Sequence, residues 1–343
     1  MYVIEQEIFA QPQALAQTRD YMLAHRDEIL DFMKGSKKVV LIGCGSSYMI
    51  SVGAAAVFNA RTDVKAVALA GGELMLAPDK YISSLRNSTV IVISRSGETS
   101  EVVYALRKLR ALTTFRTLLL TAKSECTLKD MVELTLTLPW SFDESVCQTR
   151  TIVNFYAAVL WIYGFYVDDA GLLASIGRAV SGQQAHLEQN RAVCRSVGDI
   201  AWDNVTVLAD SELCGVAQEG ALAFTEICML PGEHFRVLDY RHGPIVVAGK
   251  RKLVIAVLRP EEEEYQRKMV ADIKKRGATV IALSAWKAPV ADADVTIAIH
   301  GLDDFAAWGI PFIAICQMIA YYKALAVGHN PDEPDGLNPY ISL

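Results

Sequence analysis

Two loops rich in glycine and hydroxyl side chains are the parts of this chain best suited to binding a small anion. The first, residues 94–99 (Ser-Arg-Ser-Gly-Glu-Thr), follows the apolar run 91–93 and precedes a helix-like stretch, 101–112. A turn that leads into a helix leaves backbone N–H groups unpaired at the positive end of the helix dipole, and hydroxyls add donors without charge. The pattern favours a phosphate cradle, although Ser and Thr at such positions also serve as plain helix caps.

A second loop, residues 43–47 (Gly-Cys-Gly-Ser-Ser), repeats this design after the apolar run 39–42 and before an Ala-rich helical stretch. The two loops lie about 50 residues apart, as expected for β-α units of one parallel sheet, whose strand ends converge on one ligand site. Neither loop matches G-x-G-x-x-G or G-x-x-x-x-G-K-[ST]. The loops therefore favour a sugar phosphate over a dinucleotide or ATP.

The second half of the chain supplies candidate acid–base groups. Glu219 and Glu226 are seven residues apart on a helix-like segment, so they share one helix face, and His242 lies in an Arg-His-Gly-Pro turn. A carboxylate beside C1 and C2 of a sugar can move a proton between these carbons, and a histidine can assist ring opening or protonate a leaving amine. Glu226 borders an apolar stretch, 227–230, where a raised pKa would suit a general base. The alternatives are a solvated helix glutamate and a structural histidine.

Composition excludes several classes of function. The chain has 343 residues, 52% hydrophobic and 21% charged, with a net charge of −6 and no Lys/Arg-rich run, which disfavours nucleic acid and acidic membranes as partners. The N-terminus lacks a signal-peptide pattern, and the apolar stretch 310–327 is interrupted by Pro311, Gln317 and Lys323, so a cytoplasmic location is expected. The seven scattered cysteines predict neither disulfides nor a zinc site, and Cys44 has no adjacent histidine that would make it a nucleophile.

Alternating strand-like and helix-like segments predict the α/β class, with two tandem units that are each a parallel sheet flanked by helices in a flavodoxin-like or Rossmann-like three-layer arrangement. We expect an N-terminal helical arm at 1–34, a first unit at 35–194, a second at 195–328 and a Pro/Gly-rich tail at 329–343. A charged helix is expected at 261–276 and an apolar one at 305–327. The strand-like runs are 39–42, 66–69, 90–93, 118–120, 134–138, 205–209, 253–258, 279–283 and 295–299.

Taken together, these motifs resemble the sugar isomerase (SIS) family, and more narrowly the isomerase half of glutamine:fructose-6-phosphate amidotransferase (glucosamine-6-phosphate synthase) and the shorter fructosamine-6-phosphate deglycases. The resemblance rests on the loop 94–99, on the helix 219–226 and on the turn 241–244, and it covers the chain from about residue 35 to the Asn-Pro-Asp-Glu-Pro run at 330–334. It implies two tandem SIS domains, a homodimer or larger assembly, and a tail over the active site.

The resemblance also implies roles for individual residues. Glu226 falls on the family's catalytic glutamate and His242 on its ring-opening histidine, which in that family reaches the site of a neighbouring subunit. The substrate-binding residues that it implies are Gly45, Ser46, Ser47, Ser94, Arg95, Ser96, Thr99, Val146, Gln148 and Glu219. Arg95 stands where the synthase usually has glutamine. No metal and no organic cofactor is expected, because the acids and histidines lack ligand spacing and proton transfer beside a carbonyl needs neither.

Departures from the synthase pattern indicate which relative the chain is most like. We expect no glutaminase domain before the sugar half. The synthase lysine that forms a Schiff base is matched here by Pro339, and a second synthase lysine, on the catalytic helix, is matched by Ala223. Because deglycases dispense with the Schiff-base lysine, we expect cleavage of a 6-phosphorylated ketosamine to an amine and a hexose 6-phosphate. A glucosamine-6-phosphate deaminase, or an aldose–ketose isomerase without a glutaminase domain, is the alternative. A non-catalytic sugar-phosphate sensor is a third.

Overall fold

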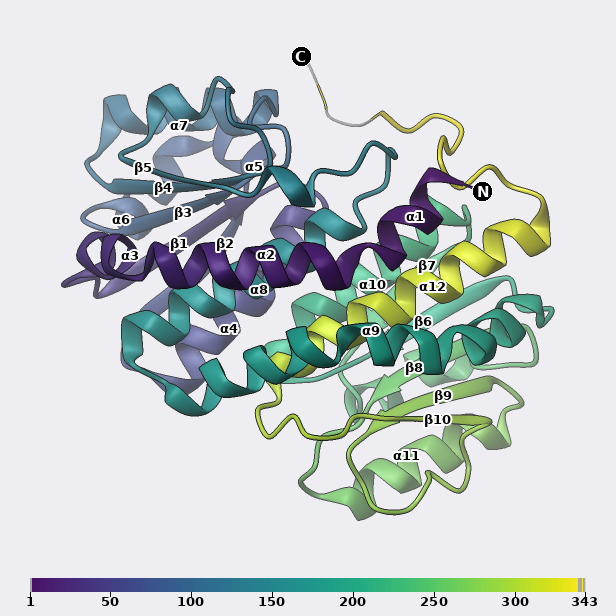
Figure 1. Cartoon of the computed structure of the whole chain (residues 1–343). Coiled ribbons are helices and arrows are strands. Elements are labelled where there is room, and N and C mark those ends of the chain that lie inside the picture. Colours follow the sequence, from purple (N-terminus) through teal and green to yellow (C-terminus); the bar gives the residue numbers. More distant parts are fainter. Residues whose placement is uncertain (1, 339–340, 342) are drawn as a thin grey trace.

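Two parallel sheets, separated by helices, form the framework of the protein (Figure 1). The computed structural model describes residues 2–338, 341 and 343. The first sheet has the order β2-β1-β3-β4-β5 and the second the order β10-β9-β8-β6-β7, with every described pairing parallel. If the strands of each unit are numbered from its first strand, the first sheet reads 2-1-3-4-5, and the second reads the same from its β7 edge. This is the flavodoxin-like arrangement. The predicted fold class, two tandem α/β units, is therefore confirmed.

The described strands lie within a residue or two of the runs expected from the sequence, with one addition. The strand β7 (Gly232–Phe235) was not expected, because it sits at a sheet edge and its sequence Gly-Glu-His-Phe has little apolar content. In register, β1 aligns Val40 with Val67 of β2 and with Val90 of β3. The other bounds are β1 Lys38–Gly43, β2 Lys65–Ala70, β3 Thr89–Ile93, β4 Arg116–Thr121, β5 Leu134–Thr137, β6 Asn204–Leu208, β8 Lys252–Val257, β9 Thr279–Ser284 and β10 Val295–Ala298.

Within the arm expected at 1–34, the structure has three helices, α1 (Val3–Phe9), α2 (Gln11–Ala24) and α3 (Arg26–Met33). The first N–H groups of α1, those of Val3 and Ile4, are capped by the distant Asp332. The remaining helices are α4 Ser46–Arg61, α5 Gly71–Leu76, α6 Ile82–Leu85, α7 Ser100–Leu112, α8 Arg150–Val167, α9 Ala170–Asp199, α10 Cys214–Ile227, α11 Glu263–Lys275 and α12 Gly309–Val327.

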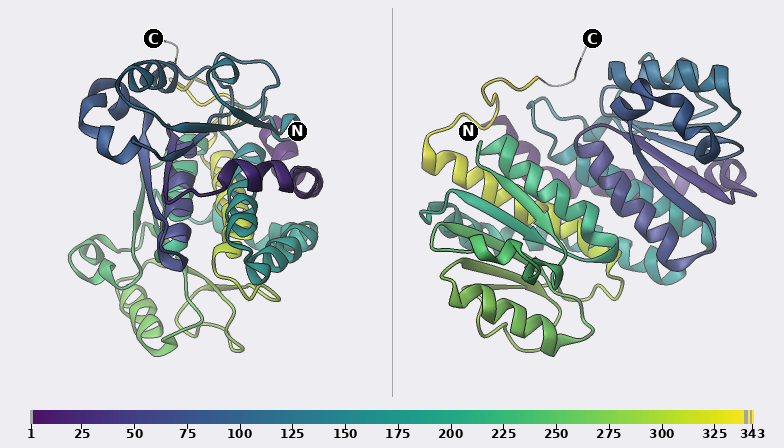
Figure 2. Two further views of the ribbon diagram at one scale, coloured as in Figure 1. Left: turned by 90° about the vertical axis from the view of Figure 1, so that its left-hand side faces the viewer. Right: turned by 180° about the vertical axis from the view of Figure 1, so that it is seen from behind.

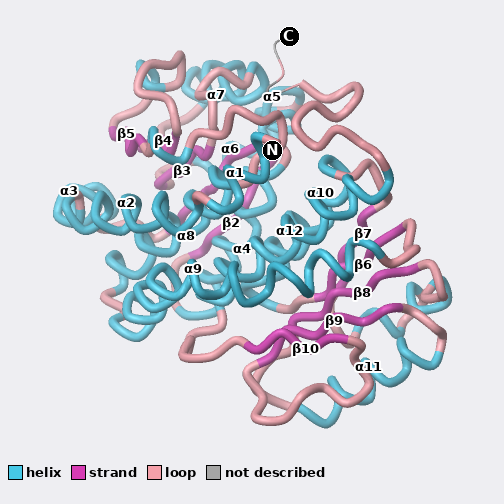
Figure 3. Tube along the Cα trace, turned by 45° about the vertical axis from the view of Figure 1, so that its right-hand side comes forward, coloured by secondary structure: helices cyan, strands magenta, loops and turns pink. Residues whose placement is uncertain are grey.

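The three central strands of each sheet are buried on both faces, as their continuous apolar runs predict, while the edge strands are partly exposed. In β1, Val39 and Leu41 belong to one large core that also includes the inner face of the second sheet, while Val40 and Ile42 pack into a separate core beneath α7. The second sheet has its own outer core beneath α11. Figure 3 shows the strands as two separate groups with helices lying between them, and Figure 2 shows the same layers from two other sides. The two units therefore share the central helical layer.

The long helix α9 packs against α12 as well as α2 and α8. The predicted domain boundary between residues 194 and 195 falls inside α9, and the division of the chain at that point stays a prediction. The segment Ala306–Val327 is long and apolar enough to span a membrane, but 83% of its apolar window is buried inside the protein. Its composition is accounted for by packing on α9 and α10, and the expected cytoplasmic location stays a prediction.

The helices α4 and α10 cross at backbone contact, which joins the first unit to the second. A Cβ on Gly215 would lie 2.2 Å from the backbone N of Gly53 and 2.3 Å from the carbonyl O of Met49. A Cβ on Gly53 would lie 2.9 Å from the carbonyl O of Glu212. Only residues without a side chain fit at this crossing, so its geometry is set by the two glycines.

We expect Gly215→Ala to destabilise the protein by about 1–3 kcal/mol, because backbone on the facing helix must move to make room. Gly182→Ala is the matched control, since Gly182 is also helical but an added Cβ there would have no neighbouring atom within 4 Å. The control should gain up to about 1 kcal/mol from helix propensity. Urea unfolding of both variants measures the difference. Equal effects would contradict the close crossing.

Candidate phosphosugar site

A cavity of about 190 Å³ lies at the carboxyl ends of β1 and β3, where the following loops lead into α4 and α7. In an open α/β sheet, neighbouring strand ends of this kind form the usual ligand crevice. The described residues that line the cavity come from both units and from the C-terminal tail. They are Cys44, Gly45, Ser46, Ser47, Ile93, Ser94, Arg95, Ser96, Thr99, Glu101, Val146, Gln148, Glu226, Leu337, Asn338 and Ile341.

The loop after β3 is held in shape by its own side chains. The Gly97 N–H donates to Ser94 Oγ over 3.1 Å, and the Glu98 N–H donates to Ser96 Oγ over 3.1 Å. Gly97 has φ of +67°, and a Cβ there would lie 2.2 Å from Cys126 Sγ. The loop is therefore formed before a ligand binds, with its Ser94 and Ser96 side chains buried at the cavity wall.

The loop after β1 makes an equally tight entry into α4. A Cβ on Gly43 would lie 2.5 Å from the carbonyl C of Ser47, and Gly45 has φ of +52°. Ser46 and Ser47 are the first residues of α4, and both are buried. The N-termini of α4 and α7 thus meet at one cavity, where the positive ends of two helix dipoles and the hydroxyl side chains favour a phosphate.

A third wall comes from the segment before α8. Arg95 donates to the carbonyl O of Ser145 over 3.1 Å and to that of Val146 over 3.2 Å, and its guanidinium lies 5.9 Å from the Phe142 ring centroid. Val146 and Gln148 then reach the cavity. The buried Oε1 of Gln148 accepts no hydrogen bond from the described residues, so it can accept one from a ligand hydroxyl.

Two carboxyl groups of α10 face the phosphate loops. Burial raises the pKa of Glu226 to about 7, although the positive charge of Arg95 opposes the shift. Glu219 lies one layer deeper, hydrogen-bonded to Ser46, and burial together with the charge of Glu226 raises its pKa well above the usual range. Both shifts favour the protonated carboxyl group, and a pKa of about 7 lets Glu226 exchange its proton readily, as a general base must.

The C-terminal tail closes one side of the cavity with Leu337, Asn338 and Ile341. The tail is attached to the start of α7, because the Ser100 N–H donates to the carbonyl O of Ile341 and the Leu343 N–H donates to Ser100 Oγ over 3.0 Å. Pro339, which matches the Schiff-base lysine position, lies outside the described residues.

The predicted residues are not all in one place. The cavity brings together Gly45, Ser46, Ser47, Ser94, Arg95, Ser96, Thr99, Val146, Gln148 and Glu226. Glu219 stands behind Ser46 and does not line the cavity. His242 is exposed at the end of the short helix η5 (Asp239–Arg241) in the second unit, where the neighbouring Arg241 pairs with Asp272 of α11. Within this one chain, His242 and Glu226 do not share a site.

Sequence reasoning missed some residues of the cavity wall. The resemblance implied a tail over the site but did not name Leu337, Asn338 or Ile341, because only the folded chain decides which tail residues reach the loops. Glu101 could have been inferred from its position in the first turn of α7. Cys44 also lines the cavity, but burial and the charge of Glu101 raise its pKa to about 11, which disfavours a thiolate nucleophile. Among the described residues, no three His, Cys, Asp or Glu side chains are grouped to hold a metal ion.

Fold and site together define a protein of two flavodoxin-like units with a cavity lined by hydroxyl side chains and by Glu226, whose pKa is raised to about 7. Residues 32–162 match the SIS domain family. Over much of its first unit, the chain is therefore similar to SIS domains.

Two curated proteins are similar to this chain along almost its whole length. The chain is 25% identical over 346 residues to the glutamine--fructose-6-phosphate aminotransferase [isomerizing] of Sulfurisphaera tokodaii, and 25% identical over 348 residues to that of Sulfolobus acidocaldarius. Each alignment covers 98% of this chain and 56% of the relative. The chain thus spans little more than half the length of these curated relatives.

Solved structures show the same fold along almost the whole chain. Tagatose-6-phosphate ketose/aldose isomerase from Escherichia coli has a TM-score of 0.87 at 20% identity, covering 99% of this chain and 95% of its own. The C-terminal domain of the Francisella tularensis glucosamine-fructose-6-phosphate aminotransferase has a TM-score of 0.84 at 18% identity, with coverages of 97% and 98%. Glucosamine-6-phosphate deaminase from Thermotoga maritima has a TM-score of 0.77 at 21% identity, with coverages of 95% and 99%.

The raised pKa of Glu226 predicts a pH-dependent stability. Between the ordinary glutamate value and about 7, the folded protein holds a proton at Glu226 that the unfolded chain releases, so stability falls as the pH rises through this window. Glutamine does not titrate. We therefore expect the difference in Tm between Glu226→Gln and wild type to be a few degrees more favourable to the variant at pH 8 than at pH 5. Thermal unfolding at both pH values measures this gain. Glu28→Gln, at an exposed acid of α3, is the control, and a pH-independent difference for Glu226→Gln would contradict the assignment.

Proposed function

We propose that this protein is an enzyme that acts on a 6-phosphorylated sugar, cleaving a ketosamine to an amine and a hexose 6-phosphate. The observation that carries the proposal is the position of Glu226, a carboxyl group with a pKa of about 7, in the same cavity as two hydroxyl-rich helix N-termini. The phosphate anchors are Ser46, Ser47, Ser94, Ser96 and Thr99, with Gly45 and Arg95 beside them.

The proposed chemistry is a proton transfer between adjacent carbons. Glu226 takes a proton from C1 of the ketosamine while the C2 oxygen gains a proton, which forms a C1=C2 enaminol. Return of the proton from Glu226 to C2, with loss of the N–H proton of the amine, leaves a C1=N imine and a C2 hydroxyl, and the N–H proton balances the one taken up by the C2 oxygen. Water adds to the imine and the amine departs, so the products are an amine and an aldose 6-phosphate. A base whose pKa lies near neutrality both accepts and returns the proton efficiently. Val146 and Gln148 are placed to contact the sugar between its phosphate and C1.

The absence of a suitable amine on the catalytic helix favours this non-covalent route. Position 223, which matches a lysine of the synthase, holds a buried alanine. Among the described residues that line the cavity there is no lysine. A Schiff base to the ketose from these described positions is therefore not part of the proposal.

A second candidate, a glucosamine-6-phosphate deaminase or an aldose–ketose isomerase, uses the same proton transfer. It is favoured by the structural likeness to proteins that carry these names, the deaminase of Thermotoga maritima and the isomerase of Escherichia coli. The candidates differ in what leaves the sugar: an amine from C1, ammonia from C2, or nothing.

Glu226→Gln should lower turnover by about two to four orders of magnitude, because it removes the general base, while phosphosugar binding changes little. The measurement is incorporation of solvent deuterium at C1 or C2, followed by NMR, together with thermal shift by the same ligand. The control is Glu28→Gln. Deuterium incorporation by the Gln variant at the wild-type rate would contradict the role of Glu226.

The same assay distinguishes the candidate reactions. Fructose 6-phosphate, glucosamine 6-phosphate and several amino-acid ketosamine phosphates are supplied separately, and amine, ammonia and hexose phosphate are measured. Amine release from the ketosamine alone supports the deglycase. Ammonia release from glucosamine 6-phosphate, or interconversion without release, supports the second candidate. Binding without deuterium incorporation on any of these sugars would overturn both in favour of a sensor.

We also propose that the protein is a homodimer or larger assembly in which His242 completes the site of a neighbouring subunit. The support is local: His242 is exposed, and so are nearby apolar side chains, with Leu238 at 40%, Val246 at 67% and Val247 at 58% exposure. Apolar side chains so exposed beside a polar group are typical of an interface. The proposed role of His242 is to assist ring opening or amine departure.

Mixing two inactive variants tests this arrangement. In a symmetric dimer that shares its sites, Glu226→Gln and His242→Asn subunits form a mixed dimer with one intact site, so a random mixture should recover roughly a quarter of wild-type activity. Subunits are exchanged by co-expression with two tags. If the mixed dimer stays inactive while both parents are folded, His242 does not act across the interface.

A further inference from the structure

We infer that Glu7, which lies outside the cavity on α1, is a positioning residue for the substrate loop, defined as residues 143–149. The inference rests on the proposed function, because the loop brings Val146 and Gln148 to the phosphosugar cavity. Glu7 does not line the cavity. It acts through the backbone of the loop.

The substrate loop has no regular secondary structure to hold it. It connects the short helix η3 (Pro139–Ser141) to α8, and its backbone groups therefore need partners elsewhere. Asp143, the first residue of the loop, accepts hydrogen bonds from the N–H groups of Thr149 and Thr151, both at 2.8 Å, and so joins the two ends of the loop and caps α8. These bonds hold the ends of the loop but leave its middle to other residues.

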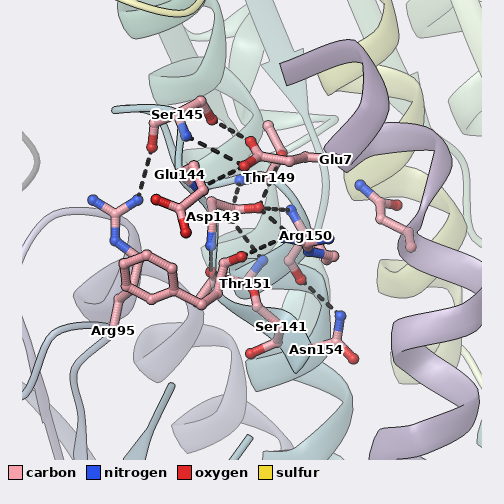
Figure 4. A network of polar contacts seen from close by, with 12 residues as sticks. Glu7, Arg95, Ser141, Asp143, Glu144, Ser145, Thr149, Arg150, Thr151 and Asn154 are labelled. Atoms are coloured by element: carbon pink, nitrogen blue, oxygen red, sulfur yellow. Dashed lines mark hydrogen bonds and ion pairs between the residues drawn. The ribbon is translucent and has the colours of Figure 1, made fainter. Parts of the chain in front are cut away.

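Glu7 holds the middle of the loop from the N–H side (Figure 4). Its Oε1 accepts from the N–H of Glu144 over 2.6 Å and from the N–H of Ser145 over 3.3 Å, and its Oε2 is hydrogen-bonded to Ser145 Oγ. Glu7 is only 3% exposed. Burial, reinforced by the charge of Asp143, raises the pKa of Glu7, while the bonds from the loop oppose the rise.

Arg95 holds the same stretch from the carbonyl side. It donates to the carbonyl O of Ser145 and to that of Val146, so Ser145 is bound by Glu7 through its N–H and hydroxyl and by Arg95 through its carbonyl. A continuous chain of contacts therefore runs from α1 through the loop to the phosphate-binding loop. Removing Glu7 releases Ser145, whose carbonyl O holds Arg95, from its contacts with α1.

The C-terminal tail connects to the same structure. Asp332 accepts from the N–H groups of Val3 and Ile4, both at 2.8 Å, and its carbonyl O accepts from the N–H of Val146 over 3.3 Å. Asp332 thus fixes the helix that carries Glu7 and touches the loop that Glu7 holds. This explains why α1, far from the cavity in sequence, has a definite position beside it.

Hydrogen bonding, rather than charge, is the contribution that matters in this arrangement. A glutamine at position 7 keeps a carbonyl oxygen for the two backbone N–H groups and an N–H₂ group that can donate to Ser145 Oγ. Ser145 Oγ can in turn donate to the carbonyl O of Cys147, 3.0 Å away. Glu7→Gln should therefore restore what Glu7→Ala removes.

The test compares Glu7→Ala, Glu7→Gln and Glu5→Ala in the full chain. Glu5 is the matched control, because it lies on the same helix but pairs with Arg191 over 2.8 Å, away from the loop. Glucose 6-phosphate affinity, KM and kcat on any turned-over substrate, and amide hydrogen exchange at 144–146 are measured. Glu7→Ala should weaken binding about tenfold or more, since two buried N–H groups lose their acceptor, with KM raised more than kcat is lowered.

The glucose 6-phosphate affinity of Glu7→Gln should stay within about threefold of that of wild type. Glu5→Ala should change neither this affinity nor amide hydrogen exchange at 144–146, apart from any change that follows from a lower Tm. Equal losses in Glu7→Ala and Glu5→Ala, or failure of the Gln variant to rescue, would overturn the inference. If Glu7→Ala does not fold, Ser145→Ala tests the same contacts. If wild type binds no phosphosugar, the proposed function fails, while amide exchange still decides whether Glu7 holds the loop.

Discussion

The close crossing of α4 and α10 is the constraint on which the site depends. Gly53 and Gly215 let the two backbones touch, and the helices leave this point toward the same cavity. The start of α4 carries Ser46 and Ser47, and the far end of α10 carries Glu226. The distance between the phosphate loops of the first unit and the carboxyl group of the second is therefore set by helix packing that tolerates no added side chain.

Electrostatics at this junction explain why a carboxyl group can sit beside a phosphate site. Two helix N-termini and the buried Arg95 supply positive potential, while burial disfavours charge on every acid nearby. Burial and the charge of Glu226 raise the pKa of Glu219 well above its usual range, while the positive charge of Arg95 limits the rise at Glu226 to a pKa of about 7. The same packing that brings the two units together thus also adjusts the proton affinity of Glu226.

Both ends of the described chain lie close to this junction. The tail lines the cavity and is attached to α7, while Asp332 caps α1, and α1 in turn holds the substrate loop through Glu7. Figure 1 shows the N-terminus beside the segment that leads into the tail. The described residues that line the cavity therefore come from five regions of sequence, which are held by hydrogen bonds as well as by apolar packing.

The sequence by itself determined the features that depend on neighbouring residues. Apolar runs such as Val39–Ile42 indicated buried parallel strands, and the glycines and hydroxyls at 43–47 and 94–99 indicated helix-entry loops, because backbone conformation and capping are local properties. Helix periodicity placed Glu219 and Glu226 on one face. The SIS resemblance followed from these local motifs.

Only the tertiary structure decided how these parts combine. Glu7 and Ser145 are 138 residues apart and Val3 and Asp332 are 329 apart, and no periodic pattern relates such positions. The edge strand β7 forms because β6 offers it a partner, and His242 and Glu226 are separated within one chain for reasons of topology that their residue types do not reveal. The pKa of Glu226 depends on desolvation by side chains from both units, so it exists only in the folded protein.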